Sequence, residues 1–174
     1  MDYRNQVIFS HFIRLRPLFS RNRRAVAWRT TVLALLTLLI FGVWLHPVVV
    51  RGSSMEPTLS NGTWHLGTRW WMDSQRHPHR GAVVIIRRAG GQTFYLKRIL
   101  ALPKEAIAFR QGQLYINAVL VEEPYRSLHS DWTLPPVELG PDEYFVAGDN
   151  RSMPMADHAA GVIHRRSLAG ELKL

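Results

Sequence analysis

Residues 106–121 read AIAFRQGQLYINAVLV, and they set the pattern for most of the chain. Short runs of apolar and β-branched residues, bounded by turn-forming residues, are typical of antiparallel strands. The runs predict strands over Ala106–Arg110, Gln113–Ile116 and Val119–Val121. Asn117-Ala118 fits the tight turn of a β-hairpin between the last two. This stretch therefore predicts short antiparallel strands rather than helices.

The same pattern continues on both sides of this stretch. Further strands are predicted over residues 82–87, 93–102 and 143–147. Gly90-Gly91 fits a hairpin turn between the first two, and segment 127–139, which contains Pro135-Pro136, is predicted to be an irregular connection. Residues after Gly52 show no sustained helical period and no repeat. We therefore expect an antiparallel barrel or folded sheet.

An uncharged segment precedes the β-rich region. Thr30–Leu45 reads TTVLALLTLLIFGVWL, and the run without charged residues continues from there to the residue before Arg51. A membrane-spanning helix needs roughly 20 apolar residues, with about 17 as a minimum, and Pro47 is expected to end this one. A cleaved signal peptide requires a small-x-small site after the apolar run, and residues 42–48 offer none. The sequence therefore predicts an uncleaved single-pass anchor over residues 30–47.

The charge of the chain is concentrated before this anchor. The formal net charge is +9, and residues 1–29 contribute +6 of it through seven arginines and one aspartate. By the positive-inside rule, this arm is predicted to be cytoplasmic and residues 48–174 to form a domain on the outer side. Because residues 30–174 carry a net charge of only +3, a nucleic-acid partner is not expected.

The composition also excludes several kinds of site. The chain has no cysteine, so disulfides, cysteine-based zinc sites and a cysteine nucleophile are ruled out. His77 and His79 form an isolated H-x-H motif with no acidic partner at helical spacing, so no metal site is predicted. Of the three lysines, only Lys97 lies inside an apolar strand, where alternation places it on the same face as Tyr95 and Ile99.

Four segments stand out in the sequence. In chain order they are Ser54–Leu59 (SMEPTL), Arg80–Val84 (RGAVV), Tyr95–Pro103 (YLKRILALP) and Gly148–Arg151 (GDNR). They resemble the nucleophile box, the next strand box, the lysine box and the final box of the type I signal peptidase family. Members of this family are membrane-bound serine proteases that remove signal peptides. With the preceding anchor, the resemblance covers nearly the whole chain. It implies a mainly β protein with one N-terminal transmembrane helix, an antiparallel β-rich catalytic domain and no cofactor.

The resemblance implies that Ser54 is the nucleophile and Lys97 its general base, in a dyad without histidine. A serine hydroxyl needs a base to accept its proton. An ordinary lysine, with a pKa near ~10.4, is protonated at neutral pH and cannot serve. Burial disfavours the ammonium form. Lowering the pKa to about 8 requires roughly 3 kcal/mol, at about 1.36 kcal/mol per pH unit.

Further roles follow from the same resemblance. The backbone amide of Ser54 is expected to form the oxyanion hole, with Gly52 as a further candidate. Met55 and Pro57 are candidates for substrate binding. The final box is expected to form a supporting turn of four residues, Gly148, Asp149, Asn150 and Arg151.

The segment after the final box departs from the family pattern. Family members usually have a serine there that helps to orient the lysine. At this position the present chain has Pro154, and Ser152 could substitute only if the loop is rearranged. This departure raises the prospect of a specialised substrate.

The resemblance implies a serine endopeptidase that removes N-terminal signal peptides from exported preproteins. The expected location is the bacterial plasma membrane, with a cytoplasmic N-terminus and the catalytic domain on the outer face. Preproteins and the lipid bilayer are the expected partners, and the sequence carries no signal for an oligomeric state. Two alternatives stay open. One is a specialised processing peptidase of the same superfamily, for example for pilin or conjugation proteins. The other is an inactive membrane-anchored domain that only binds preproteins.

Overall fold

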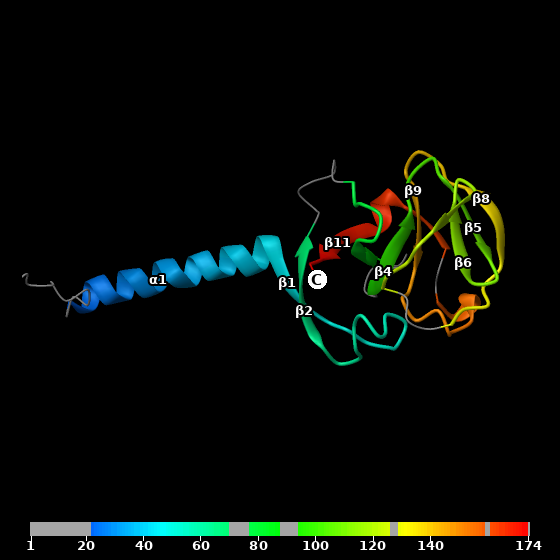
Figure 1. The fold of residues 1–174 in the computed structure, drawn as a ribbon. Helices are drawn as coiled ribbons and strands as arrows, with labels where there is room; N and C mark the ends of the chain where they lie inside the picture. Colours follow the sequence, from blue (N-terminus) through cyan, green and yellow to red (C-terminus); the bar gives the residue numbers. More distant parts are fainter. Residues whose placement is uncertain (1–21, 70–76, 88–93, 126–128, 159–160, 174) are drawn as a thin grey trace, which may run out of the picture. The chain divides into compact units, whose positions relative to one another are not determined.

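The computed structural model describes residues 22–69, 77–87, 94–125, 129–158 and 161–173 (Figure 1). Most of the predicted N-terminal arm and the predicted Gly90-Gly91 turn lie outside these residues. The chain divides into two compact units, residues 1–38 and residues 39–174.

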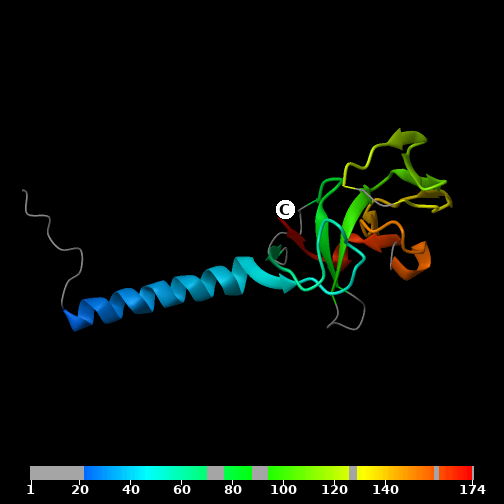
Figure 2. The ribbon, with the colours of Figure 1, turned by 60° about the horizontal axis from the view of Figure 1, so that its bottom comes forward.

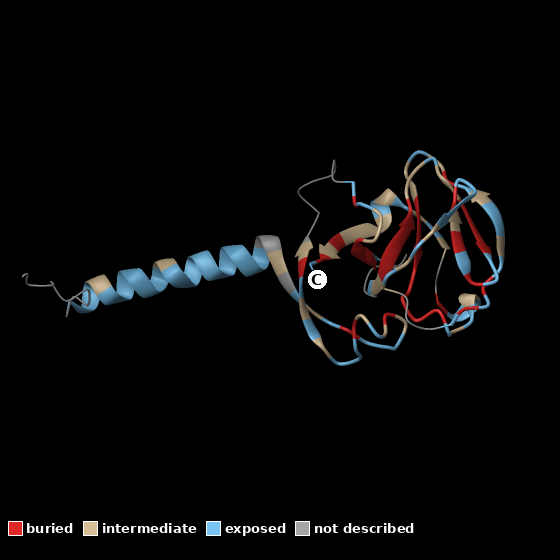
Figure 3. Cartoon of the chain, viewed as in Figure 1, coloured by how far each residue is buried: buried red, intermediate tan, exposed pale blue. Residues whose placement is uncertain are grey.

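The apolar segment forms helix α1 (Arg23–Leu39), which continues into a π-helical turn, η1 (Ile40–Trp44). Figure 3 shows α1 without buried residues. Its threonines are compatible with an apolar environment because their hydroxyls bond to backbone carbonyls one turn earlier, as Thr37 does to Leu33. Residues Arg23–Gly42 are long and apolar enough to cross a membrane, by length and composition.

The helical conformation differs at both ends from the predicted range of 30–47. It begins already at Arg23 and ends at Trp44, and Pro47 lies in strand β1 (Leu45–Val49) rather than at the end of a helix. β1 is the terminal strand of its sheet. A proline is tolerated in such an edge strand, because only one side of the strand pairs with a neighbour.

The larger sheet is antiparallel throughout and has seven strands in the order β1-β2-β11-β3-β4-β9-β10. Besides β1, they are β2 (Trp64–Arg69), β3 (Val83–Arg87), β4 (Phe94–Ala101), β9 (Glu143–Ala147), β10 (Gly161–His164) and β11 (Leu168–Leu172). β4, which carries Lys97, lies between β3 and β9. The C-terminal strand β11 joins the β1–β2 ribbon to the rest of the sheet.

The smaller sheet has four antiparallel strands in the order β7-β6-β5-β8. Its segments are the yellow-green and yellow parts of the ribbon in Figure 2. They are β5 (Ala106–Arg110), β6 (Gln113–Ile116), β7 (Val119–Val121) and β8 (Leu134–Glu138). The predicted hairpin turn is confirmed, since Asn117 and Ala118 both have positive φ, 52° and 66°. The prediction of an irregular connection was wrong for β8. β8 is an edge strand, and its pairing with β5 shifts in register between Ile107 and Phe109, which together accommodate the two prolines.

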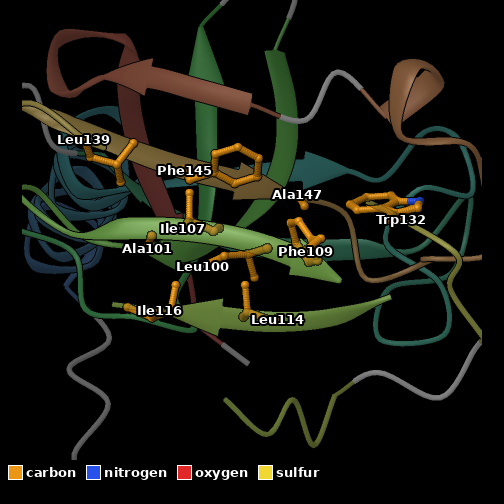
Figure 4. Packing of buried hydrophobic residues seen from close by; sticks show 10 residues of the cluster. All are labelled: Leu100, Ala101, Ile107, Phe109, Leu114, Ile116, Trp132, Leu139, Phe145 and Ala147. Atoms are coloured by element: carbon orange, nitrogen blue, oxygen red, sulfur yellow. The ribbon is translucent and has the colours of Figure 1, made fainter. Parts of the chain in front are cut away.

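Two short 3₁₀ helices complete the described elements, η2 (Met155–His158) and η3 (Arg165–Ser167). The main hydrophobic cluster draws residues from both sheets, as Figure 4 shows. Phe109 of β5 is fully buried and contacts the rings of Phe145 of β9 and of Trp132. This shared core fixes β4 and β9 against the smaller sheet.

A second cluster anchors the turn that follows β1. Met55 and Leu59 pack with Val83 and Ile85 of β3 and with Leu172 of β11. The amide of Leu59 donates to the carbonyl of Met55 at 3.0 Å, so one helical turn brings both side chains to the sheet. This burial holds the segment that contains Ser54 against the larger sheet.

Candidate active site

Ser54 and Lys97, which are far apart in the sequence, meet in the structure. Lys97 Nζ lies 2.8 Å from Ser54 Oγ, within hydrogen-bonding distance. Ser54 comes from the turn after β1 and is half-buried, whereas Lys97 comes from β4 and is 3% exposed. A nucleophile and a base in direct contact are the arrangement that covalent catalysis by a serine requires.

The surroundings of Lys97 favour its neutral form. Burial lowers the pKa of Lys97 to about 8, and the carboxylate of Asp149 opposes this shift without cancelling it. In the part of the chain that the structure describes, Ser54 Oγ is the hydrogen-bond partner of Lys97 Nζ. A lysine with a pKa near 8 is partly deprotonated under mildly basic conditions and can accept the serine proton.

The GDNR segment lies directly against the backbone of Ser54. The amide of Asn150 donates to the carbonyl of Ser54 at 3.1 Å, and Asn150 Nδ2 donates to the carbonyl of Ser53 at 3.1 Å. Gly148 is required by close packing, because a Cβ at this position would lie 2.0 Å from the carbonyl oxygen of Ser54. The structure therefore brings the predicted supporting turn to Ser54.

Asp149 ties this turn to two other segments. Its carboxylate accepts from Arg98 Nε at 2.8 Å and Nη2 at 2.5 Å, and also from the Thr58 hydroxyl at 2.5 Å. The guanidinium of Arg98 stacks over the ring of Tyr125 at 4.1 Å. Asp149 thus joins β4 to the turn of residues 53–59 through buried, charge-assisted bonds. We call residues 53–59 the nucleophile turn because they contain the candidate nucleophile Ser54.

Arg151 holds the turn from its other end. It is fully buried, donates from Nε to the carbonyl of Gly148 at 2.8 Å, and pairs with both carboxylate oxygens of Glu123. The hydroxyl of Tyr125 donates to the same carboxylate at 3.0 Å. Burial, together with the charge of Glu123, raises the pKa of Tyr125. Both ions of the pair are compensated, which a buried ion pair requires.

The structure does not support the predicted role of Gly52 in the oxyanion hole or that of Met55 in substrate binding. The amide of Gly52 donates to Asn61 Oδ1 at 3.0 Å, so it is already engaged and offers no free donor for an oxyanion. Met55 is 2% exposed and belongs to the core. It therefore offers no accessible surface to a substrate. Pro57 is exposed, and its role in substrate binding stays a prediction.

The segment after the GDNR turn explains part of the sequence departure. Ser152 Oγ donates to Asn150 Oδ1 at 2.6 Å, so its hydroxyl is directed to the turn, and it is not the partner that orients Lys97. Pro154 is exposed. His158, which follows four residues later, is fully buried beside the turn. No motif in the sequence pointed to this histidine.

Within the described ranges, no group of three or more His, Cys, Asp or Glu residues could hold a metal ion. Of the H-x-H motif, the Nδ1 atom of His77 lies 3.1 Å from the hydroxyl of Tyr144, and His79 is exposed.

Comparisons with known proteins show which family this chain resembles. The family model described as "Signal peptidase, peptidase S26" matches residues 23–174. A signal peptidase I from Bacillus amyloliquefaciens is 31% identical over 170 residues, covering 88% of this chain and 89% of the relative. Signal peptidase I T from Bacillus subtilis is 33% identical over 155 residues, covering 82% and 79% of the two chains. A crystal structure of a signal peptidase I from Enterococcus faecalis has 23% identity and a TM-score of 0.45, covering 56% of this chain and 98% of that one. The match to the family model and the length of the aligned relatives show that this chain belongs to the signal peptidase family, peptidase S26.

Proposed function

We propose that this chain is a membrane-anchored serine endopeptidase that removes N-terminal signal peptides from exported preproteins. The observation that carries the proposal is the contact of 2.8 Å between Ser54 Oγ and the buried amine of Lys97. Membership of the signal peptidase family and the names of the relatives give the reaction and the class of substrate. The N-terminal helix, which is apolar and long enough to span a bilayer, supports the membrane anchor.

The dyad can perform both halves of the reaction. Neutral Lys97 accepts the proton of Ser54 while the serine oxygen attacks the carbonyl carbon of the scissile peptide bond. The C–N bond then breaks, and the Lys97 ammonium gives its proton to the departing amine. In the second half, Lys97 takes a proton from water, which attacks the ester. Ser54 recovers its proton, and the signal peptide leaves as a carboxylic acid.

The backbone of Ser54 can stabilise the intermediate. Among the described residues, the Ser54 amide has no hydrogen-bond acceptor, whereas its carbonyl accepts from Asn150. A preorganised amide that faces the developing oxyanion typically contributes about 10²-fold or more to the rate. The carbonyl of Ser53 shares a planar peptide with this amide, and it accepts from Asn150 Nδ2 at 3.1 Å, so the orientation of the peptide that bears the amide is fixed.

The proposed placement puts the catalytic domain on the outer face of a bacterial plasma membrane. The proposal assigns residues 1–29 to a cytoplasmic arm, because their charge of +6 precedes the uncharged segment that starts at Thr30. The extracytoplasmic domain then begins near β1. The chain between Trp44 and Ser54 can extend at most roughly 33 Å, at about 3.3 Å per residue. Ser54 is therefore tethered near the membrane surface, where signal-peptide cleavage sites emerge.

A preprotein cleavage assay tests the proposal. The full chain, in detergent or lipid vesicles, is expected to cleave a preprotein at a site with small side chains at the first and third positions before the cut. Ser54→Ala and Lys97→Ala are expected to lower kcat at least about 10³-fold, because each removes one half of the dyad. Lys104→Ala is the matched control, since Lys104 is exposed. If both dyad variants cleave at the wild-type rate, the mechanism is wrong.

The rearranged segment 152–158 favours a second candidate, a specialised processing peptidase with the same dyad. In this segment Pro154 stands where a serine is usual, and His158 is buried beside the turn. A panel of unrelated preproteins separates the two candidates. Cleavage of most of the panel supports general signal-peptide removal, whereas dyad-dependent cleavage of a single pilin-type or conjugation-type substrate supports the specialised enzyme.

A further inference from the structure

His158 lies beside the candidate active site but takes no part in the reaction described above. It ends the short helix η2, and its side chain is 0% exposed. The ring of Trp132 packs edge-on against the imidazole, with ring centroids 4.9 Å apart. This packing leaves the imidazole little room to rotate, so its two nitrogens have fixed directions.

The hydrogen bonds of His158 determine its tautomer. The amide of Gly148 lies 3.1 Å from Nδ1, and a backbone amide can only donate, so Nδ1 carries no proton. The carbonyl oxygen of Asn150 lies 2.6 Å from Nε2, and a carbonyl can only accept, so Nε2 carries the hydrogen. The imidazole is therefore neutral, with one acceptor and one donor, and both are used.

These two bonds fasten both ends of the Gly148-Asp149-Asn150 turn to one rigid ring. From the same turn, the amide of Asn150 donates to the carbonyl of Ser54, and Asn150 Nδ2 donates to the carbonyl of Ser53. A continuous path of hydrogen bonds thus leads from the imidazole of His158 to the backbone of the nucleophile.

Direct packing supplies a second path between the same residues. A Cβ on Gly148 would lie 2.0 Å from the carbonyl oxygen of Ser54 and 2.6 Å from Cε1 of His158. The backbone at Gly148 therefore fills the space between the imidazole and the nucleophile. A change in the size or position of the ring at 158 is transmitted to Ser54 by contact.

The charges around the ring keep it neutral. Burial lowers the pKa of His158 to about 4, and the nearby positive charges of Lys97 and Arg151 act in the same direction. The bond to Asn150 and the charge of Asp149 act against this shift. At any pH at which Lys97 is partly deprotonated, Nδ1 of His158 is free to accept from Gly148.

We propose that His158 is a positioning residue, whose neutral imidazole bridges Gly148 and Asn150 and so holds the backbone of Ser54 against Lys97. The inference rests on the proposed function, because it assigns a role within the same reaction. It also accounts for the departure after the final box, since Pro154 has no hydroxyl and Ser152 binds Asn150.

Kinetics of His158 variants test this role. His158→Ala is expected to lower kcat about 10- to 100-fold, because small displacements of a nucleophile are costly. KM is expected to stay within about twofold. His158→Asn keeps an acceptor near the position of Nδ1, and His158→Gln keeps a donor near that of Nε2. Each is expected to show a kcat between those of the alanine variant and the wild type.

Ile116→Ala is the matched control for loss of stability alone. Ile116 is 5% exposed in the main core and belongs to β6 of the smaller sheet. At a temperature at which all variants are folded, this control is expected to keep the wild-type kcat. A kcat for His158→Ala within twofold of the wild type overturns the proposal. The proposal is also overturned if kcat falls by the same factor in all three His158 variants and in Ile116→Ala.

A measurement without cleavage separates this inference from the proposed function. NMR titration of the Lys97 side chain is expected to give a higher pKa in His158→Ala than in the wild type, because the buried contact with Ser54 loosens. Ile116→Ala is expected to leave this pKa unchanged. If the wild type cleaves no preprotein, the proposed function fails, and the Lys97 titration still decides the role of His158. An unchanged Lys97 pKa in His158→Ala overturns it.

Discussion

Arg98 binds the carboxylate of Asp149 through two nitrogens, Nε at 2.8 Å and Nη2 at 2.5 Å, in a pair that is almost fully buried. Lys97 is the neighbour of Arg98 in β4. The negative charge of Asp149 acts to raise the pKa of Lys97. Because the guanidinium compensates this charge, Asp149 can support the nucleophile turn while Lys97 keeps a low pKa. The base therefore lies beside a carboxylate that does not hold it protonated.

The first prediction concerns the pH dependence of cleavage by the wild type. Lys97 must be neutral to accept the serine proton, and its pKa is lowered to about 8 by burial. Below pH 8, kcat is expected to fall about tenfold for each pH unit, because the neutral fraction falls by that factor. Cleavage rates of one peptide between pH 5 and 10 measure this. A rate that is constant between pH 5 and 8 contradicts a lysine base.

The second prediction concerns the charge of Asp149. Asp149→Asn removes the charge that raises the pKa of Lys97 and leaves the positive charge of Arg98 uncompensated. Both changes lower the pKa of Lys97 further, so the rise of kcat with pH is expected to move to lower pH. The free energy of unfolding is expected to fall by about 3 kcal/mol, because one partner of a buried pair is removed.

The pH profile of Asp149→Asn is therefore measured at a temperature at which the variant is folded. Asp142→Asn serves as the control, because Asp142 pairs with Arg165 at a partly exposed site. A shift of the profile to higher pH in Asp149→Asn would show that the charge of Asp149 does not act on Lys97 in this way.

The third prediction is that Lys97 costs stability. In the folded state its pKa is about 8, against an ordinary 10.5, so between these values the unfolded chain binds more protons than the native one. Stability therefore rises with pH between about 8 and 10.5, and the full cost is present below pH 8. At about 1.36 kcal/mol per pH unit, this cost is about 3 kcal/mol.

Lys97→Met removes this cost while keeping a long side chain. The variant is expected to be inactive, and at pH 7 to be more stable than the wild type by up to about 3 kcal/mol. The gain is expected to disappear near pH 11, where Lys97 is neutral in both states. Urea unfolding at the two pH values measures it, with Lys104→Met as the exposed control. A loss of stability at pH 7 contradicts the low pKa.

The strands of this protein could be predicted well where each is bounded by turn residues. The ranges predicted for β5, β6, β7 and β9 agree with the structure, because short alternating runs and their turns are local signals. β1, β2, β10 and β11 were not predicted. The β1–β2 ribbon is joined to β3 through the C-terminal strand β11, a pairing between distant parts of the chain that no local pattern encodes.

The site shows the same division between local and distant signals. Ser54 and Lys97 could be found from the sequence because their boxes carry distinctive residues, and the structure brings the two side chains together. The residues that support the dyad, such as Arg98 and His158, could not be found from the sequence in this way. Arg98 reads as a charged residue next to Lys97, and its burial goes with contacts to residues distant in the sequence, Asp149 and Tyr125. His158 lies in a segment that departs from the family pattern.

The last prediction concerns the contact between Gly148 and Ser54. Gly148→Ala would place a methyl group 2.0 Å from the Ser54 carbonyl oxygen and 2.6 Å from Cε1 of His158, and the first of these atoms belongs to the backbone. The nucleophile turn must therefore move. We expect kcat to fall at least about 10²-fold, because the oxygen of Ser54 no longer meets Lys97 in the required geometry. The cost in stability is expected to be about 1–3 kcal/mol, the usual range for overpacking.

Gly42→Ala is the matched control, since a Cβ at that position would have no neighbour within 4 Å. Parallel measurements of kcat and of thermal unfolding for the two variants check the prediction. A wild-type kcat in Gly148→Ala would mean that the position of the Ser54 carbonyl does not limit the reaction.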